Sequence, residues 1–115
     1  MPITRGTTPT ARLTAKGVNL EEKQLQITFQ TGDRKIIKES DSGDISVTYD
    51  SEHTKSVIQV ALSQEETLLL KAGAGRCQVR WVTELGSAGA TKIAGFEVHP
   101  ILKDGLLEWR AESGS

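Results

Sequence analysis

Apolar and polar residues alternate with a period of two through most of this chain. In residues 24–30, Leu25, Ile27 and Phe29 share one face, and glutamine and threonine side chains occupy the other. This alternation is typical of a strand in an antiparallel sheet with one buried face. The same period predicts further strands at 45–49, 56–62 and 76–83, with weaker ones at 10–15, 34–38 and 91–98.

The segment 91–98 departs from strict alternation. Ile93 and Phe96 are both large and apolar, but three positions separate them, so a regular strand would turn them to opposite faces. A bulge near Ala94–Gly95 would bring both side chains to the buried face, and glycine favours such an irregularity. The sequence therefore predicts a bulge at this point.

Turn residues separate the predicted strands. Stretches that contain glycine and aspartate recur about every 8–12 residues, which is typical of a β-sandwich or barrel. One segment differs, because Ser63-Gln64-Glu65-Glu66 has the pattern of a capping box and predicts a short helix near 63–70. Gly73 and Gly75 follow and would end it. The chain is therefore predicted to be all-β with one short helix.

The length of 115 residues is that of one domain. Residues 1–9 hold two prolines, three threonines and little apolar content, so we expect an extended N-terminal arm there. A single β-sandwich domain is expected at 10–109, and a flexible tail at 110–115.

The charge balance argues against two kinds of partner. Fourteen basic and fifteen acidic residues give a net charge of -1, whereas nucleic-acid-binding surfaces carry a basic excess. The chain has no polybasic patch for a membrane surface and no apolar run near the roughly 20 residues of a transmembrane helix. Its first residues lack the apolar stretch of a signal peptide. We therefore expect synthesis in the cytoplasm, with neither nucleic acid nor a membrane as partner.

No residue pattern predicts a catalytic, cofactor or metal site. Cys77 is the single cysteine and is predicted to be a small buried hydrophobic residue. His53 and His99 form no pair with metal-ligand spacing, and the loop Asp41–Asp44 lacks the spacing of a calcium-binding EF-hand. We expect no enzyme and no cofactor. A small enzyme whose titratable groups converge in a cleft remains an alternative.

The two tryptophans bear on interfaces. Trp81 falls on the inward face of its strand, which favours core packing over a stacking platform and leaves Arg80 exposed. Trp109 follows an apolar stretch, and it either folds back as a last strand or packs on another subunit. The candidate interface residues are Arg80, Ile101, Leu102, Leu106, Leu107 and Trp109.

Four short motifs carry a resemblance to a known family. They are Ile3-Thr4-Arg5-Gly6-Thr7-Thr8-Pro9-Thr10, Leu62-Ser63-Gln64-Glu65-Glu66-Thr67-Leu68, Gln78-Val79-Arg80-Trp81 and Ile101-Leu102-Lys103-Asp104-Gly105-Leu106. In this order they resemble the N-terminal domain of baseplate upper proteins and related tail components of phages and prophages of Gram-positive bacteria, over most of residues 3–107. Between Gly43 and Ser56 the chain is longer than the pattern, with an extra hairpin or a protruding loop as the alternatives.

The resemblance implies an immunoglobulin-like antiparallel β-sandwich, here of about seven to eight strands, that assembles by symmetry in a virion. No catalytic residue carries over. The expected function is a non-enzymatic structural or adaptor component of a tail or baseplate. Its expected partners are other virion proteins and further copies of itself, and its expected location is the virion. The alternative is a β-sandwich module that binds carbohydrate or a host surface.

Overall fold

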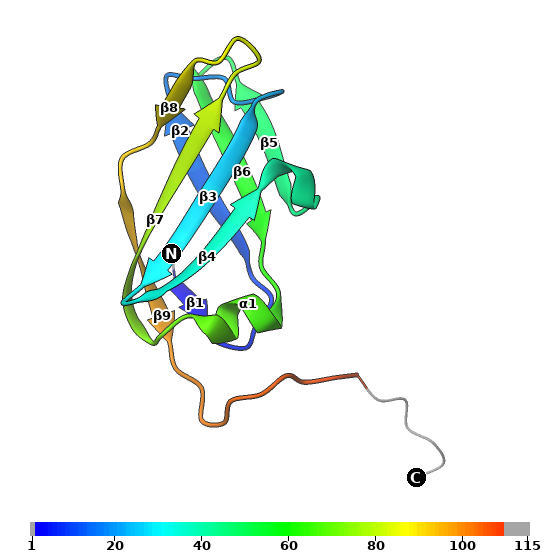
Figure 1. Cartoon of the computed structure of the whole chain (residues 1–115), viewed down its shortest axis with the longest axis vertical. Coiled ribbons are helices and arrows are strands. Elements are labelled where there is room, and N and C mark those ends of the chain that lie inside the picture. The colour runs from blue at the N-terminus through cyan, green and yellow to red at the C-terminus, as the bar shows by residue number, and fades with distance from the viewer. Residues whose placement is uncertain (1, 110–115) are drawn as a thin grey trace.

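The computed structural model describes residues 2–109, which form a mostly β domain with one short α-helix (Figure 1). All strands predicted from alternation are present, although the one predicted at 91–98 begins only at Ala94. The helix α1 spans Gln64–Leu69, and a single 3-10 turn covers Ser40–Ser42. The strands are β1 (Pro2–Thr4), β2 (Thr10–Lys16), β3 (Gln24–Thr31), β4 (Arg34–Glu39), β5 (Ile45–Asp50), β6 (Lys55–Ala61), β7 (Gly73–Val82), β8 (Ala88–Ala90) and β9 (Ala94–His99).

The larger sheet has the order β1-β9-β7-β3-β4, and β8 pairs with β7 on the same side as β9. Strand β7 is antiparallel to β3, β8 and β9, whereas β1 runs parallel to β9, with Ile3 opposite Val98. The sheet is therefore mixed, and the prediction of a purely antiparallel fold is wrong for this pair. Residues 2–109 form nine strands rather than seven to eight, because β1 and β8 are too short for an alternation signal.

The smaller sheet is antiparallel with the order β2-β6-β5, and it faces the larger one (Figure 1). The predicted inward residues of β3, Leu25, Ile27 and Phe29, are buried, as are Ile58 and Val60 of β6. Cys77 is buried, Trp81 is half-buried against the core, and Arg80 is exposed, as predicted. The two inner faces thus form one apolar core.

The predicted helix and its capping box are confirmed. The Ser63 hydroxyl accepts a hydrogen bond from the backbone N–H of Glu66 at 3.1 Å, and the Glu66 carboxylate accepts one from the backbone N–H of Ser63 at 2.9 Å. These bonds satisfy donors that the first helical turn leaves unpaired. The buried Thr67 donates to the backbone oxygen of Thr7 at 2.9 Å, which fastens the helix to the N-terminal segment.

Pro2–Thr4 belong to the larger sheet as β1, so the extended arm predicted at 1–9 is wrong for these residues. Ile3 is 1% exposed and packs in the core, and Arg5 donates from its backbone to the His99 oxygen at 3.1 Å. The backbone of β1 pairs with the edge of β9, and this register places the Ile3 side chain on the buried face of the sheet. The prediction of an arm rested on the low apolar content of residues 1–9, and a single buried side chain was not enough to show in that content.

The predicted irregularity near Ala94–Gly95 lies slightly earlier in the chain. Pairing on β7 runs from Arg80↔Ala90 to Cys77↔Ala94, so two β7 residues oppose three residues, 91–93. This is the count of a β-bulge. It leaves Ile93 59% exposed while Phe96 is buried, so the prediction that both would be buried is wrong.

Candidate functional site

The segment from Pro100 to Trp109 contains no strand or helix and leaves the body of the domain below α1 (Figure 1). Its apolar side chains are unusually exposed: Leu107 is 80% and Trp109 94% exposed. Leu102 and Leu106 are also exposed. Contiguous exposed apolar side chains are typical of an association surface. Within the described residues, the fold-back of Trp109 as a last strand is therefore wrong.

Arg5 anchors the start of this segment. Its guanidinium donates to Asp104 Oδ1 at 2.6 Å and Oδ2 at 2.9 Å, in the two-pronged geometry that gives arginine–carboxylate pairs their directional strength. The same guanidinium donates to the backbone oxygens of Leu68 and Leu70 at the end of α1, at 2.9 and 2.8 Å. One side chain thus joins the N-terminal strand, the helix and the C-terminal segment.

Gln64 holds the segment at a second point. Its side-chain amide donates to the Leu107 backbone oxygen at 2.9 Å and accepts from the Leu107 backbone N–H at 2.8 Å. Ile101 packs over Gly6, where an added Cβ would lie 3.1 Å from Ile101 Cδ1. The backbone of the segment is therefore held against the domain, while the side chains of Leu106 and Leu107 remain in solvent. Such fixation lowers the entropy cost of binding a partner.

The structure places five of the six candidate interface residues on this one segment. Ile101 is half-buried at the base of the segment, and Leu102, Leu106, Leu107 and Trp109 are exposed along it. Arg80 lies elsewhere, on the outward face of β7 opposite Gln26. The apolar stretch was visible in the sequence, but the anchoring residues Arg5 and Gln64 were not predicted. In the sequence, Arg5 and Gln64 stood out only as members of the short motifs that carry the family resemblance.

Lowering the pH is expected to break the contact between Arg5 and Asp104 at the start of the segment. The hydrogen bonds from Arg5 hold the pKa of the Asp104 carboxyl below its ordinary value of 3.8. The contact is therefore present above that value and is lost as the pH falls through the lowered pKa. We expect the backbone amides of Asp104 and Gly105 to become more mobile in heteronuclear NOE measurements as the pH falls below 3.8 and through the lowered pKa of Asp104, whereas Leu107 stays held by Gln64. Asp104→Asn should already show this mobility at pH 7, and rigid amides in that variant would contradict the anchor.

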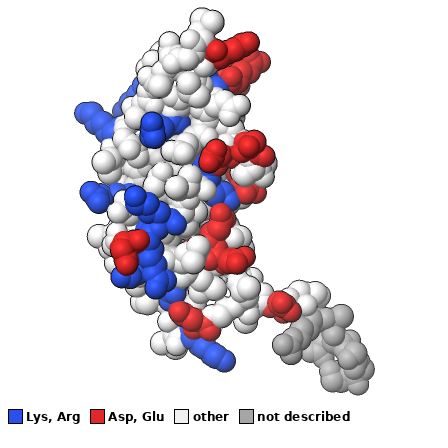
Figure 2. All heavy atoms as spheres, in the orientation of Figure 1, with Lys and Arg blue, Asp and Glu red and all other residues white. Residues whose placement is uncertain are grey.

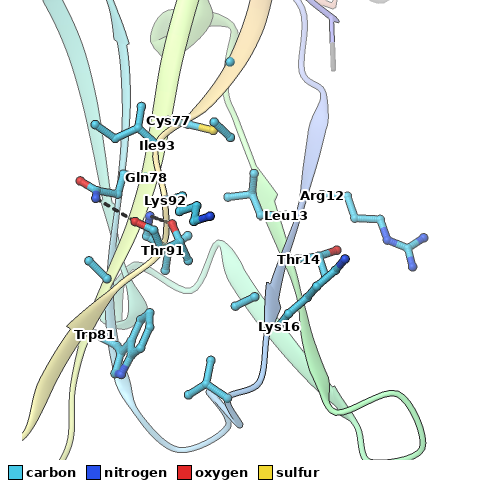
Figure 3. A pocket seen from close by; sticks show the side chains of 16 residues that line it. Arg12, Leu13, Thr14, Lys16, Cys77, Gln78, Trp81, Thr91, Lys92 and Ile93 are labelled. Carbon is cyan, nitrogen blue, oxygen red and sulfur yellow. Dashed lines mark hydrogen bonds between the residues drawn. The ribbon is translucent and has the colours of Figure 1, made fainter.

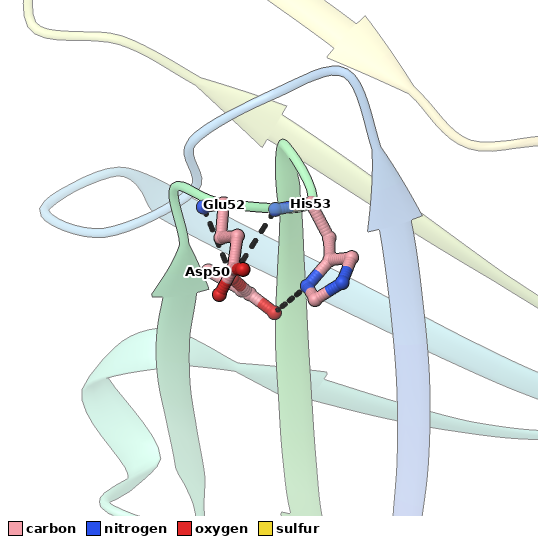
Figure 4. A group of neighbouring side chains, drawn as sticks. All are labelled: Asp50, Glu52 and His53. Atoms are coloured by element: carbon pink, nitrogen blue, oxygen red, sulfur yellow. Dashed lines mark hydrogen bonds and ion pairs between the residues drawn. The ribbon is translucent and has the colours of Figure 1, made fainter.

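Within residues 2–109, one group of three metal-ligand side chains comes together, Asp50, Glu52 and His53 in the loop between β5 and β6 (Figure 4). His53 Nδ1 lies 2.8 Å from Asp50 Oδ2, and this hydrogen bond lowers the pKa of the Asp50 carboxyl. The other Asp50 oxygen accepts from the backbone N–H groups of Glu52 and His53 at 3.1 and 3.3 Å. These hydrogen bonds form a tight turn, in which the Asp50 carboxylate is bonded by the neighbouring residues of its own loop.

Within residues 2–109, the loop Asp41–Asp44 contributes to no group of three metal-ligand side chains. Asp44 is 2.7 Å from the Lys38 ammonium, and Gly43 has a left-handed φ of 80° that ends the 3-10 turn. This arrangement stabilises the connection from β4 of the larger sheet to β5 of the smaller one. Within residues 2–109, no helix has the length and apolar character needed to cross a membrane.

Comparison with known proteins adds no family. A scan against protein-family models finds no match, and a search of curated proteins finds no significantly similar relative.

Proposed function

We propose that this chain is a non-enzymatic structural or adaptor component of a phage or prophage tail or baseplate, and that it acts through protein–protein interfaces. The exposed C-terminal segment supports the assembly role most directly, because its apolar side chains project from a backbone held by Arg5 and Gln64. The phage setting comes from the motif resemblance over residues 3–107. Other virion proteins and further copies of the chain are the partners we propose, with the virion as its location.

The strand order supports an immunoglobulin-like sandwich as part of this proposal. In variable-type immunoglobulin domains, strands C′, C, F and G form one sheet and B, E and D belong to the other. Here β4-β3-β7-β9 and β2-β6-β5 follow the same order, with α1 at the crossing from β6 to β7. The chain departs from antibody domains in having one cysteine, Cys77, so no disulfide joins its sheets.

Self-association is the central test. The purified full chain has a mass of 12.5 kDa, and multi-angle light scattering should report a larger mass that rises with concentration. The double variant Leu107→Ser, Trp109→Ser should associate at least about tenfold more weakly, because it removes exposed apolar anchors. The matched control is Leu85→Ser, since Leu85 is 95% exposed in the loop between β7 and β8 and should not matter.

Two outcomes would overturn the assembly role: a wild-type chain that stays monomeric at all concentrations, or equal losses in the double variant and in Leu85→Ser. The phage setting has its own check in the neighbouring genes. Tail or capsid genes beside this one would support it, and their absence would count against it. Glycan-array binding that depends on Trp109 would favour the carbohydrate-binding alternative instead.

A further inference from the structure

An apolar groove of about 720 Å³ opens where the two sheets fail to meet, between β2 and the β8–β9 edge (Figure 3). Leu13 and Val18 line one side of the groove. Val79, Trp81 and Ile93 line the other. In Figure 3, Leu13 points into the space between the strands, and Arg12 points away from it. The bulge at 91–93 keeps Ile93 exposed at this opening.

One edge of β2 runs along the groove. Within residues 2–109, β2 pairs with β6 alone, and the Pro9 oxygen accepts from Leu62 N–H while the Gly17 N–H donates to the Thr54 oxygen. Hydrogen-bonded and non-hydrogen-bonded residues alternate in an antiparallel pair. The odd-numbered residues of β2 therefore bond to β6, and the backbone groups of Arg12 and Thr14 point to the open edge. An edge of this kind accepts an added strand.

The charges around the groove restrict what enters it. The charged residues that line it, Arg12, Lys16 and Lys92, are all cationic. Within residues 2–109, none of the three forms an ion pair. A suitable occupant is an extended segment with apolar side chains toward the groove and a carboxylate on the other face, where Arg12 and Lys16 stand.

The C-terminal segment of this chain has that pattern. In an extended strand, Leu107 and Trp109 share one face and Glu108 lies on the other. With Leu107 and Trp109 in the groove, Glu108 would lie beside Arg12 and Lys16 as a cross-strand pair of opposite charge.

The segment of the same molecule is directed away from this groove. Arg5 and Gln64 hold it against α1, and α1 is joined to β4 by the Lys38–Glu66 ion pair at 2.9 Å. Strand β4 lies at the opposite edge of the larger sheet from β9 and β8. Figure 2 shows basic side chains gathered mainly on the left of the view, over β7 and the start of β4, and acidic ones mainly on the right, near the 3-10 turn Ser40–Ser42 and α1. This polarity favours head-to-tail contact between copies.

We propose that the groove between β2 and the β8–β9 edge binds residues Leu106–Trp109 of a second copy, added as a strand on β2. The inference rests on the proposed function and names the surface that receives the segment. Since donor and acceptor surfaces differ, copies join either reciprocally as a twofold dimer or head to tail as a ring or an open chain.

Charge exchange in the full chain tests this contact. Arg12→Glu and Glu108→Arg should each weaken self-association about tenfold, because each places like charges opposite one another. The combined variant should associate within about threefold of wild type, since the pair is restored in reverse. The control is Lys35→Glu, an exposed lysine on β4 that should leave association unchanged. If Leu107→Ser, Trp109→Ser abolishes association and Arg12→Glu does not, the groove is wrong and the assembly role stands.

Fluorescence gives an independent readout. The chain has two tryptophans, so Trp109→Phe leaves Trp81 in the groove as the sole indole fluorophore. Its emission should shift to shorter wavelength as concentration rises and oligomers form, because docking removes water from the groove. Association without any change in Trp81 emission would overturn the groove as the binding surface, and absence of association in every variant would instead overturn the proposed function.

Discussion

Replacing Lys38 with methionine is expected to lower the free energy of unfolding by about 1.5 kcal/mol, which corresponds to a fall in Tm of roughly 6 °C. Lys38 points inward from β4 and its side chain is 5% exposed. Its ammonium lies 2.7 Å from Asp44 and 2.9 Å from Glu66. The substitution would remove the charged hydrogen bonds to both carboxylates and leave two like charges side by side, although Asp44 and Glu66 are 44% and 24% exposed and water would hydrate them in part.

The same ion pair predicts a loss of stability in alkali. Burial lowers the pKa of Lys38, but the hydrogen bonds to Asp44 and Glu66 outweigh it, so the pKa lies above its ordinary value of 10.5. The charged form therefore stabilises the fold below that value, and this contribution disappears as the pH rises through the raised pKa. Thermal unfolding between pH 9 and about pH 12 should show a steeper fall in Tm for wild type than for Lys38→Met.

Lys35→Met is the matched control for the stability effect. Lys35 is exposed on the same strand, and its loss should change stability by less than about 0.5 kcal/mol. A Lys38→Met variant as stable as Lys35→Met would show that the ion pairs of Lys38 with Asp44 and Glu66 do not stabilise the fold.

Replacing Gly75 with alanine is expected to cost about 2 kcal/mol. A Cβ at this position of β7 would lie 2.6 Å from Cζ of Phe96 and 2.9 Å from Cγ2 of Thr31, which is closer than atoms can approach. Phe96 cannot move aside easily, because its ring packs edge-on against Phe29 with centroids 5.8 Å apart. Closely packed interiors transmit such strain to the backbone. Denaturant unfolding of the variant should show the loss as a lower midpoint with an unchanged slope.

Gly95, opposite Arg76 on β9, gives the comparison. An added Cβ there would have its nearest atom, the Gly75 oxygen, at 3.9 Å. Gly95→Ala should therefore be neutral or slightly stabilising, because alanine loses less backbone freedom on folding. Equal losses of stability in Gly75→Ala and Gly95→Ala would show that the contact with Phe96 is not the cause.

Local patterns were enough to predict much of this fold. The face of β3 that carries Leu25, Ile27 and Phe29 is readable because side chains alternate strictly in a strand. The Ser63–Glu66 capping box is readable because both partners lie within one helical turn. The apolar character of Leu106, Leu107 and Trp109 is equally a property of the sequence, and it drew attention to the C-terminal segment before any geometry was known.

The tertiary structure decided what depends on contacts between distant residues. Arg5 binds Asp104 across 99 positions and Gln64 binds Leu107 across 43, so no local pattern announces either anchor. Burial of Ile3 needed the free edge of β9, and the exposure of Ile93 needed the one-residue offset between β8 and β9. The sequence by itself determined the seven longer strands, most of their faces and the short helix, because these follow from neighbours along the chain. The parallel β1–β9 pair, the groove beside β2 and the anchored segment were decided by packing, because each forms only when remote segments meet.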